Sequence, residues 1–207
     1  TMAIVSILVF FMMTVTILGN IVDSKSAVEA MGAIYTECDV NFKKVPDDKT
    51  FEAMEKVVEK YSPIEKSYYM AGLYCSLDGE EIYCQVYKNP KVIAAIKGRV
   101  PLYDNEIAIT ELIGEELNLK IGDKVIVAGV DKKEEYVISG IFQSINDTGM
   151  TFMISLDGAK RIGIHEIVFA GYSLTIPAKA KEAAKALNDS FGDILEAESS
   201  AGENIME

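Results

Sequence analysis

Few residues in this sequence could carry out chemistry: a single histidine, three cysteines and a scatter of carboxylates. A Ser-His-acid triad would have to use His165, yet no Gly-x-Ser-x-Gly turn is present to supply the serine. Catalysis needs several converging groups, so we interpret His165 as a histidine at the surface or at a strand boundary. The sequence predicts no enzymatic site.

The three cysteines, Cys38, Cys75 and Cys84, lack the spacing of a zinc site, and the acidic turns lack that of a calcium loop. We therefore predict neither a metal nor another cofactor. Cys75 and Cys84 flank an Asp-Gly turn at residues 78–79. A four-residue loop would place them opposite each other, ready for a disulfide outside the cell, whereas a two-residue loop would offset them. Buried free thiols are the alternative.

Four tyrosines, Tyr68, Tyr74, Tyr83 and Tyr87, fall within the same expected hairpin. Tyrosine is favoured at interfaces, so these side chains could form a surface for a partner or ligand. Packing of the rings across the sheet is the competing interpretation.

Charge is distributed unevenly along the 207 residues. The formal net charge is −12, yet the mean hydropathy is +0.16, because residues 1–22 contain no charged side chain. The chain thus has an apolar segment and an acidic globular part. Apolar residues are too frequent for an intrinsically disordered protein. With Arg99 and Arg161 as the only arginines, it lacks the basic surface that nucleic acid requires.

The uncharged segment, residues 1–22, predicts a transmembrane helix, since a bilayer core needs about 20 apolar residues. No basic residue precedes the apolar run, as a signal peptide would require. The threonines Thr14 and Thr16 can bond back to the helix backbone. Helical spacing continues into residues 23–31, and Gly32 offers a stop, so we predict a stiff helical stalk there.

The globular part has three sections. Residues 34–97 predict a strand, a helix, a tyrosine-rich hairpin and a short helix at 91–96; the next section is strand-rich; the last has a strand and a helix that stops at Gly192. This order predicts an α+β fold, a porter-like layer of helices on a mainly antiparallel sheet with an inserted strand-rich subdomain.

The middle section carries a family pattern. It contains Gly98-Arg99-Val100-Pro101, an acidic-apolar strand that begins at Glu106, an Ile-Gly-Asp turn with Gly122 and Asp123, and a strand with Gly140-Ile-Phe at its end. In this order the segments resemble the extracytoplasmic (MacB-like periplasmic core) domain of FtsX-like/MacB-like ABC transporter permeases.

This resemblance implies a porter-like subdomain of residues 32–97 and 164–207 and an inserted subdomain of residues 98–163. It implies a domain outside the cell membrane, extracellular or periplasmic, that follows the first membrane helix of a permease for export or efflux. The permease would pair with a second permease subunit or half and with a cytoplasmic ABC ATPase, since this chain has no ATP-binding Gly-x-x-x-x-Gly-Lys-Ser/Thr loop. Peptides, lipoproteins or lipids are the implied cargo.

In such a permease the stalk residues Asp23, Ser26, Val28 and Met31 would transmit ATP-driven movement to the outer domain. A second function fits the residues as well: a singly anchored extracellular module that binds a peptide or protein.

Overall fold

The computed structural model describes residues 2–22 and 25–200, and it describes side chains in α1 from Ser6 to Thr16. The helices are α1 (Met2–Val22), α2 (Lys25–Ala30), α3 (Asp48–Val58), α4 (Glu111–Glu116), α5 (Leu156–Arg161) and α6 (Ala180–Phe191), with the 3-10 turns η1 (Pro90–Val92), η2 (Asn146–Gly149) and η3 (Pro177–Lys179). The strands are β1 (Cys38–Phe42), β2 (Ile64–Leu77), β3 (Glu80–Tyr87), β4 (Ala95–Gly98), β5 (Glu106–Thr110), β6 (Lys124–Ala128), β7 (Lys133–Phe142), β8 (Thr151–Ser155), β9 (Phe169–Leu174) and β10 (Leu195–Ser199).

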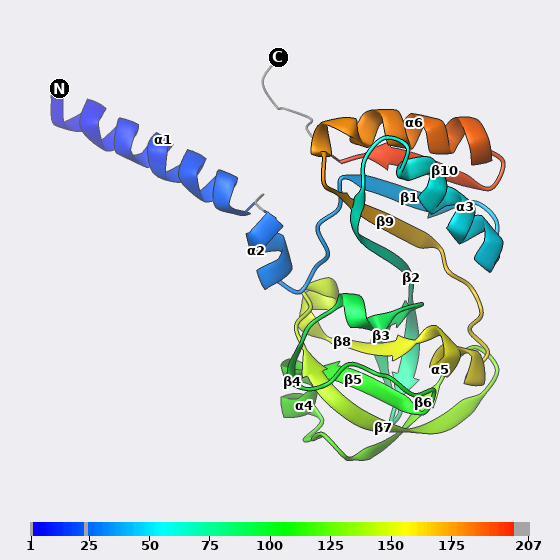
Figure 1. The fold of residues 1–207 in the computed structure, drawn as a ribbon. Helices are drawn as coiled ribbons and strands as arrows, with labels where there is room; N and C mark the ends of the chain where they lie inside the picture. The colour runs from blue at the N-terminus through cyan, green and yellow to red at the C-terminus, as the bar shows by residue number, and fades with distance from the viewer. Residues whose placement is uncertain (1, 23–24, 201–207) are drawn as a thin grey trace.

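The strands of the described residues form one sheet in the order β10-β1-β9-β2-β3-β8-β5-β7-β4, and β6 pairs with both β2 and β7. The pairs β2–β3, β3–β8, β8–β5, β5–β7, β7–β6 and β6–β2 close a ring, so these strands form a barrel. The barrel is the lower half in Figure 1, and β2 runs from it into the upper half. The predicted α+β class is confirmed.

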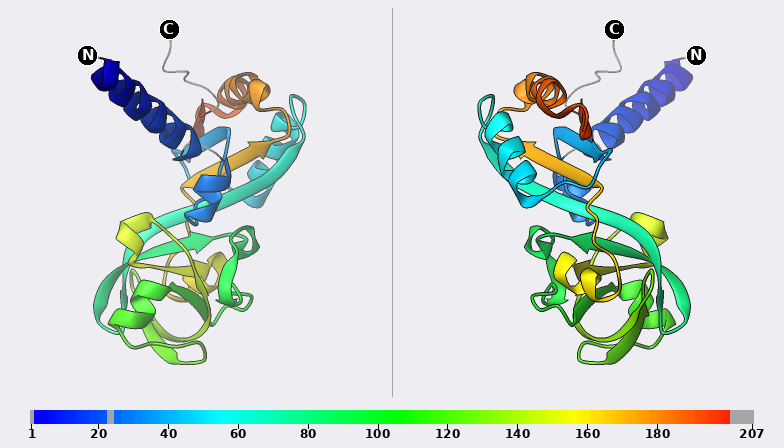
Figure 2. Two further views of the ribbon diagram at one scale, coloured as in Figure 1. Left: turned by 90° about the vertical axis from the view of Figure 1, so that its left-hand side faces the viewer. Right: turned by 90° about the vertical axis from the view of Figure 1, so that its right-hand side faces the viewer.

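Each half has its own apolar core. Inside the barrel, side chains from β2, β3, β5, β6, β7 and β8 meet, with Tyr136 and Phe152 fully buried among them. In the upper half, α3 and α6 pack on the same face of β1, β9 and β10, around Met54 and Leu187. Figure 2 shows the two halves from opposite sides, with β2 running from one half into the other. The hairpin β2–β3 contributes to both cores, and the division of the chain into subdomains at residues 98 and 163 stays a prediction.

The hairpin turn forms as the Asp-Gly pair predicts. Leu77 pairs with Glu80, which leaves a two-residue loop. Its residues Asp78 and Gly79 have φ of 50° and 102°, as a type I′ turn requires. Because Cys75 pairs with Ile82 in this register, the two hairpin cysteines are offset and not opposite.

The helix predicted at residues 91–96 is wrong. The Asn89 side chain caps only the single turn η1, and Ile93 is already extended with φ of −99° and ψ of 138°. The following residues then join the sheet as β4, which pairs with β7. Pairing with a neighbouring strand thus overrides the local preference for helix.

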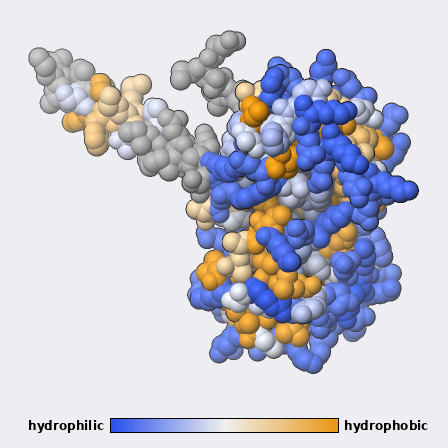
Figure 3. All heavy atoms as spheres, in the orientation of Figure 1, coloured by the Kyte–Doolittle hydropathy of each residue, from blue (hydrophilic) through white to orange (hydrophobic). Residues whose placement is uncertain are grey.

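Helix α1 projects from the globular part (Figure 1), and Figure 3 colours much of its described surface as apolar. Thr14 and Thr16 donate hydroxyl hydrogen bonds to the carbonyls of Phe10 and Met12, at 2.8 and 2.9 Å, as predicted. Among the residues that the structure describes, no helix is long and apolar enough to cross a membrane. Side chains are described for residues 6–16 of the predicted membrane span at residues 1–22, and the other side chains of the span lie outside the described part of the chain.

Candidate coupling site at the stalk

Two ion pairs hold the short helix α2 on the start of β2. In one pair α2 supplies the lysine, and in the other it supplies the glutamate. Lys25 Nζ lies 2.5 Å from a Glu65 carboxylate oxygen, and Lys66 Nζ lies 2.6 Å from one of Glu29. The Glu65 carboxylate raises the pKa of Lys25, and Lys25 lowers the pKa of Glu65. These side chains are partly exposed, so each pair alone stabilises little. Together they fix the position of α2 along β2.

The end of α2 presses against the barrel. Gly32 has φ of +79°, and its N–H bonds to the Glu29 carbonyl while the next N–H bonds to that of Val28. This is a glycine-terminated helix end, as predicted. A Cβ on Gly32 would lie 2.0 Å from the Gln143 carbonyl oxygen, just beyond β7. Only glycine therefore allows this close approach between the stalk and the barrel.

A hollow of about 300 Å³ lies where α2, β2, the η1–β4 segment and the end of β7 meet. Its lining includes Glu29, Lys66, Ile93, Ile96 and Gln143. The stalk thus touches both halves of the globular part, through β2 above and through Gln143 below. A displacement of α2 would therefore push or pull on both halves through these two contacts.

The chain enters and leaves the upper half at adjacent points. Ser200, directly after β10, donates its N–H to the Glu37 carbonyl at 3.0 Å and its hydroxyl to the Thr36 carbonyl at 2.6 Å. Glu37, directly before β1, is 3% exposed, and its carboxylate accepts the Leu174 N–H at 2.7 Å. The segments that lead in and out are therefore fastened to each other.

The predicted stalk residues are placed only in part. Asp23 lies outside the described residues, and Ser26 is in α2 with its side chain undescribed. Val28 and Met31 are half-buried. Sequence reasoning missed the ion-pairing residues. A signal was present, since Lys25 and Glu29 are one helical turn apart, and the adjacent Glu65 and Lys66 carry the charges that complement them.

The family-pattern residues build the barrel rather than a site. Gly98 has φ of +67°, and a Cβ on Gly140 would lie 2.3 Å from the Arg99 carbonyl oxygen. These two glycines let β4 and β7 pack at close range. Gly122 has φ of +95° and bonds to the Ile138 carbonyl at 2.8 Å, while the Asp123 carboxylate accepts the Lys120 N–H at 2.8 Å.

Arg99 and Glu106 form a two-point ion pair within this pattern. The two terminal guanidinium nitrogens of Arg99, Nη1 and Nη2, donate to the two carboxylate oxygens of Glu106. The same carboxylate accepts the N–H groups of Leu102 and Tyr103 at 3.0 and 3.2 Å. The Arg99 hydrogen bonds are the main reason why the pKa of Glu106 is lowered. The network fixes the turn that contains buried Pro101 at the start of β5.

Solved structures are similar to this chain, among them the crystal structure of the extracellular domain of the noncanonic ABC-type transporter YknZ from Gram-positive bacteria. The TM-score is 0.54 and the identity 13%, over 78% of this chain and 100% of that one. The chain has the fold of a transporter's extracellular domain. The predicted resemblance is confirmed at the level of the fold. No protein-family model matches the chain, and no curated protein matches it.

Within this transporter-domain fold the four tyrosines do not form one surface. Tyr87 is 4% exposed and packs in a core, and Tyr68 is half-buried. Tyr74 is 56% exposed and makes an edge-to-face contact with Tyr83, with ring centres 5.5 Å apart. Of the four, only Tyr74 is largely exposed, while Tyr83, like Tyr68, is half-buried.

The cysteines are buried and unbonded. Cys75 and Cys84 lie diagonally across β2 and β3, close enough for a hydrogen bond between their thiols. Burial raises the pKa of Cys84 well above that of a free thiol. Both side chains are buried free thiols in this structure, and a disulfide between them outside the cell stays a prediction.

His165 is exposed beside a groove at the junction of the two halves. Glu166 and apolar side chains line the same groove, and none of its described lining residues is a serine or cysteine. The described residues contain no group of three or more histidine, cysteine, aspartate or glutamate side chains that could hold a metal.

Proposed function

We propose that this chain is the extracellular domain and first membrane helix of an ABC transporter permease, and that α2 carries ATP-driven movement to the domain for export or efflux. The observation that carries the proposal is a stalk docked on both halves of a fold shared with a transporter's extracellular domain. In this proposal a cytoplasmic ABC ATPase and a second permease subunit or half are the partners, and the domain lies outside the cell.

Two further features support the proposal. Ser200 is bonded to Thr36 and Glu37, so the domain could be inserted between two membrane segments of a longer permease. The described apolar side chains of α1, such as Phe10 at 73% exposure, lack a protein core around them. A bilayer would cover such a surface. The membrane anchor itself rests on the uncharged sequence of residues 1–22.

The proposed location is tested by thiol labelling of intact cells. The three native cysteines are buried, so the unchanged chain supplies the background. Glu80→Cys places a thiol on the exposed hairpin tip. We expect a membrane-impermeant maleimide to label this variant before lysis. Labelling only after lysis would overturn the extracellular location.

The proposed coupling is tested in proteoliposomes that contain the full-length protein and the ATPase that copurifies with it. A dye on Glu80→Cys reports its distance to acceptor-labelled lipids by energy transfer. We expect ATP to change the transfer, and a Gly-Ser linker inserted between Asp23 and Ser26 to abolish that change. The same insertion between Asp131 and Lys132, in an exposed turn, is the control.

A linker variant that keeps the full ATP response would refute the mechanical role of the stalk. Failure of any ABC ATPase to copurify with the full-length protein would refute the permease assignment and favour the singly anchored binding module.

A further inference from the structure

Strand β2 has a gap along one of its edges. One edge pairs with β3 without interruption from Met70 to Leu77. The other edge pairs with β9 as far as Met70 and with β6 only from Ser76. In the part of the chain that the structure describes, no strand pairs with residues 71–75 on this second edge.

The backbone groups that face the gap follow from the register. The Tyr69 carbonyl accepts Lys88 N–H from the β3 side, so the odd-numbered residues of β2 bond to β3. The Met70 carbonyl accepts Val168 N–H from the opposite side. Alternation along a strand then points the N–H and C=O groups of Gly72 and Tyr74 into the gap. Among the described residues these groups have no backbone hydrogen bond there.

A groove of about 340 Å³ runs along this edge. Its floor and walls are mainly apolar, with Leu73, Ile164 and Val168 half-buried or buried and Val130 72% exposed. The segment that leads from α5 to β9 forms the far wall, and it can be followed beside β2 in the right-hand view of Figure 2.

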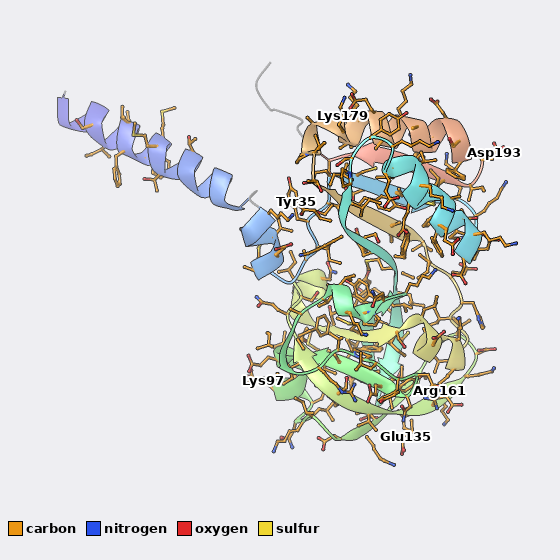
Figure 4. The ribbon with its side chains drawn as sticks, viewed as in Figure 1. Tyr35, Lys97, Glu135, Arg161, Lys179 and Asp193 are labelled. Atoms are coloured by element: carbon orange, nitrogen blue, oxygen red, sulfur yellow. The ribbon has the colours of Figure 1, made fainter. Side chains whose placement is uncertain are left out.

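The other open edges of the sheet are protected against strand pairing. The outer edge strand β10 exposes Glu196 and Glu198. At the other end of the sheet, β4 is short, has an irregular register and exposes Lys97, which Figure 4 labels at the margin of the barrel. Charges and irregularities of this kind keep edge strands from pairing with other chains. On β2 itself the gap has neither, since Gly72 and Tyr74 are uncharged, and the charged Glu166 stands on the opposite wall of the groove.

We propose that the gap in β2 binds an extended segment of a partner polypeptide by strand addition. Residues 71–75 span about 16 Å at about 3.3 Å per residue, which suits a segment of about five residues. Its backbone would bond to Gly72 and Tyr74, and an apolar side chain would enter the groove between Leu73 and Ile164. A lipid chain would fill the groove but lacks the alternating donors and acceptors that the edge requires. This inference does not rest on the transporter assignment.

Hydrogen exchange of the full chain in detergent tests the open edge directly. We expect the amides of Gly72 and Tyr74 to exchange at least about 100-fold faster than those of Leu73 and Cys75, which bond to β3. Equal protection of all four amides would show that the edge is already paired and would overturn the proposal.

Binding is tested with a phage-displayed library of linear seven-residue peptides, selected on the full chain and then synthesised. Tyr74→Pro removes the N–H that faces the gap, and Tyr74→Ala removes the ring but keeps that N–H. We expect the selected peptides to lose at least about 10-fold in affinity with Tyr74→Pro and to bind Tyr74→Ala nearly normally. Equal binding by the two variants would refute main-chain recognition.

A second variant keeps the test decisive if Tyr74→Pro unfolds. Val130→Asp charges the rim of the groove at a highly exposed position and should leave the fold intact. We expect it to weaken the same peptides at least about 10-fold. Failure to select any peptide that distinguishes the unchanged chain from Val130→Asp would overturn the proposal.

Discussion

Replacing Glu106 by glutamine should destabilise the barrel more than the corresponding change of its partner. The Glu106 side chain is 10% exposed and accepts hydrogen bonds from Arg99, Leu102 and Tyr103. The Arg99 side chain is 44% exposed and can recover water when its partner is removed. Glu106→Gln removes the charge that all four donors face and turns one Arg99 bond into a contact between two donors, whereas Arg99→Gln leaves the charged carboxylate with its two backbone donors.

The size of the effect follows from this asymmetry. Breaking a buried ion pair from one side costs about 3–5 kcal/mol. The exposure of Arg99 reduces this, so we expect Glu106→Gln to lower the free energy of unfolding by about 2–3 kcal/mol. For Arg99→Gln we expect about 1–2 kcal/mol, because the surviving backbone donors still stabilise the carboxylate.

Urea unfolding of the full chain in detergent, followed by tyrosine fluorescence, measures both changes, since the chain has 10 tyrosines and no tryptophan. The double variant gives the coupling energy, which should exceed about 1 kcal/mol. A loss below about 0.5 kcal/mol for Glu106→Gln, the value of a typical exposed pair, would refute the argument from burial. A greater loss for Arg99→Gln than for Glu106→Gln would refute the asymmetry.

The same pair predicts a pH dependence. Arg99 holds the folded pKa of Glu106 below its unfolded value of about 4.3. The stabilisation is therefore complete above that value and is lost as the pH falls through the folded pKa. The stability difference between the unchanged chain and Glu106→Gln should shrink in that acid range. A difference that stays constant down to acid unfolding would contradict the assignment.

Three further predictions concern packing, the stalk and the thiols. Gly140→Ala should lower the free energy of unfolding by at least about 2 kcal/mol, because the new Cβ would meet the backbone of Arg99. Gly114→Ala in α4 should lower it by less than about 1 kcal/mol. Thermal unfolding of the two variants measures both changes. Lys25→Glu should speed hydrogen exchange of the α2 amides, and adding Glu65→Lys should return the exchange rate to that of the unchanged chain. An unchanged rate in both variants would show that this ion pair does not hold α2 in place. Burial raises the pKa of Cys38 to about 12, so its alkylation at neutral pH should proceed only at the rate of unfolding, as mass spectrometry under rising urea would show.

Local signals sufficed for several elements. The Asp78-Gly79 pair predicts its two-residue turn because only residues that tolerate positive φ fit a type I′ loop. Gly32 predicts the end of α2 for a similar reason. The order of helices and strands predicts the α+β class, since each amphipathic element needs a layer to cover it.

The helix predicted at residues 91–96 failed because β7 was an available partner far along the chain, and no local pattern announces such a partner. The role of Tyr87 could not be predicted either. A strand tyrosine has the same sequence signal whether it faces solvent or a core, and the burial of Tyr87 depends on a cluster with distant residues such as Val100 and Phe142.

The sequence by itself determined the uncharged segment at residues 1–22, the acidic globular part and the glycines that only certain turns accept, because charge, hydropathy and φ preference are local properties. The tertiary structure alone decided that β6 closes the barrel onto β2 and that α2 lies on β2 through Lys25 and Glu65. It alone decided that residues 71–75 keep an open edge. Each of these depends on which distant segments meet, and strand pairing and packing settle that only when the whole chain has folded.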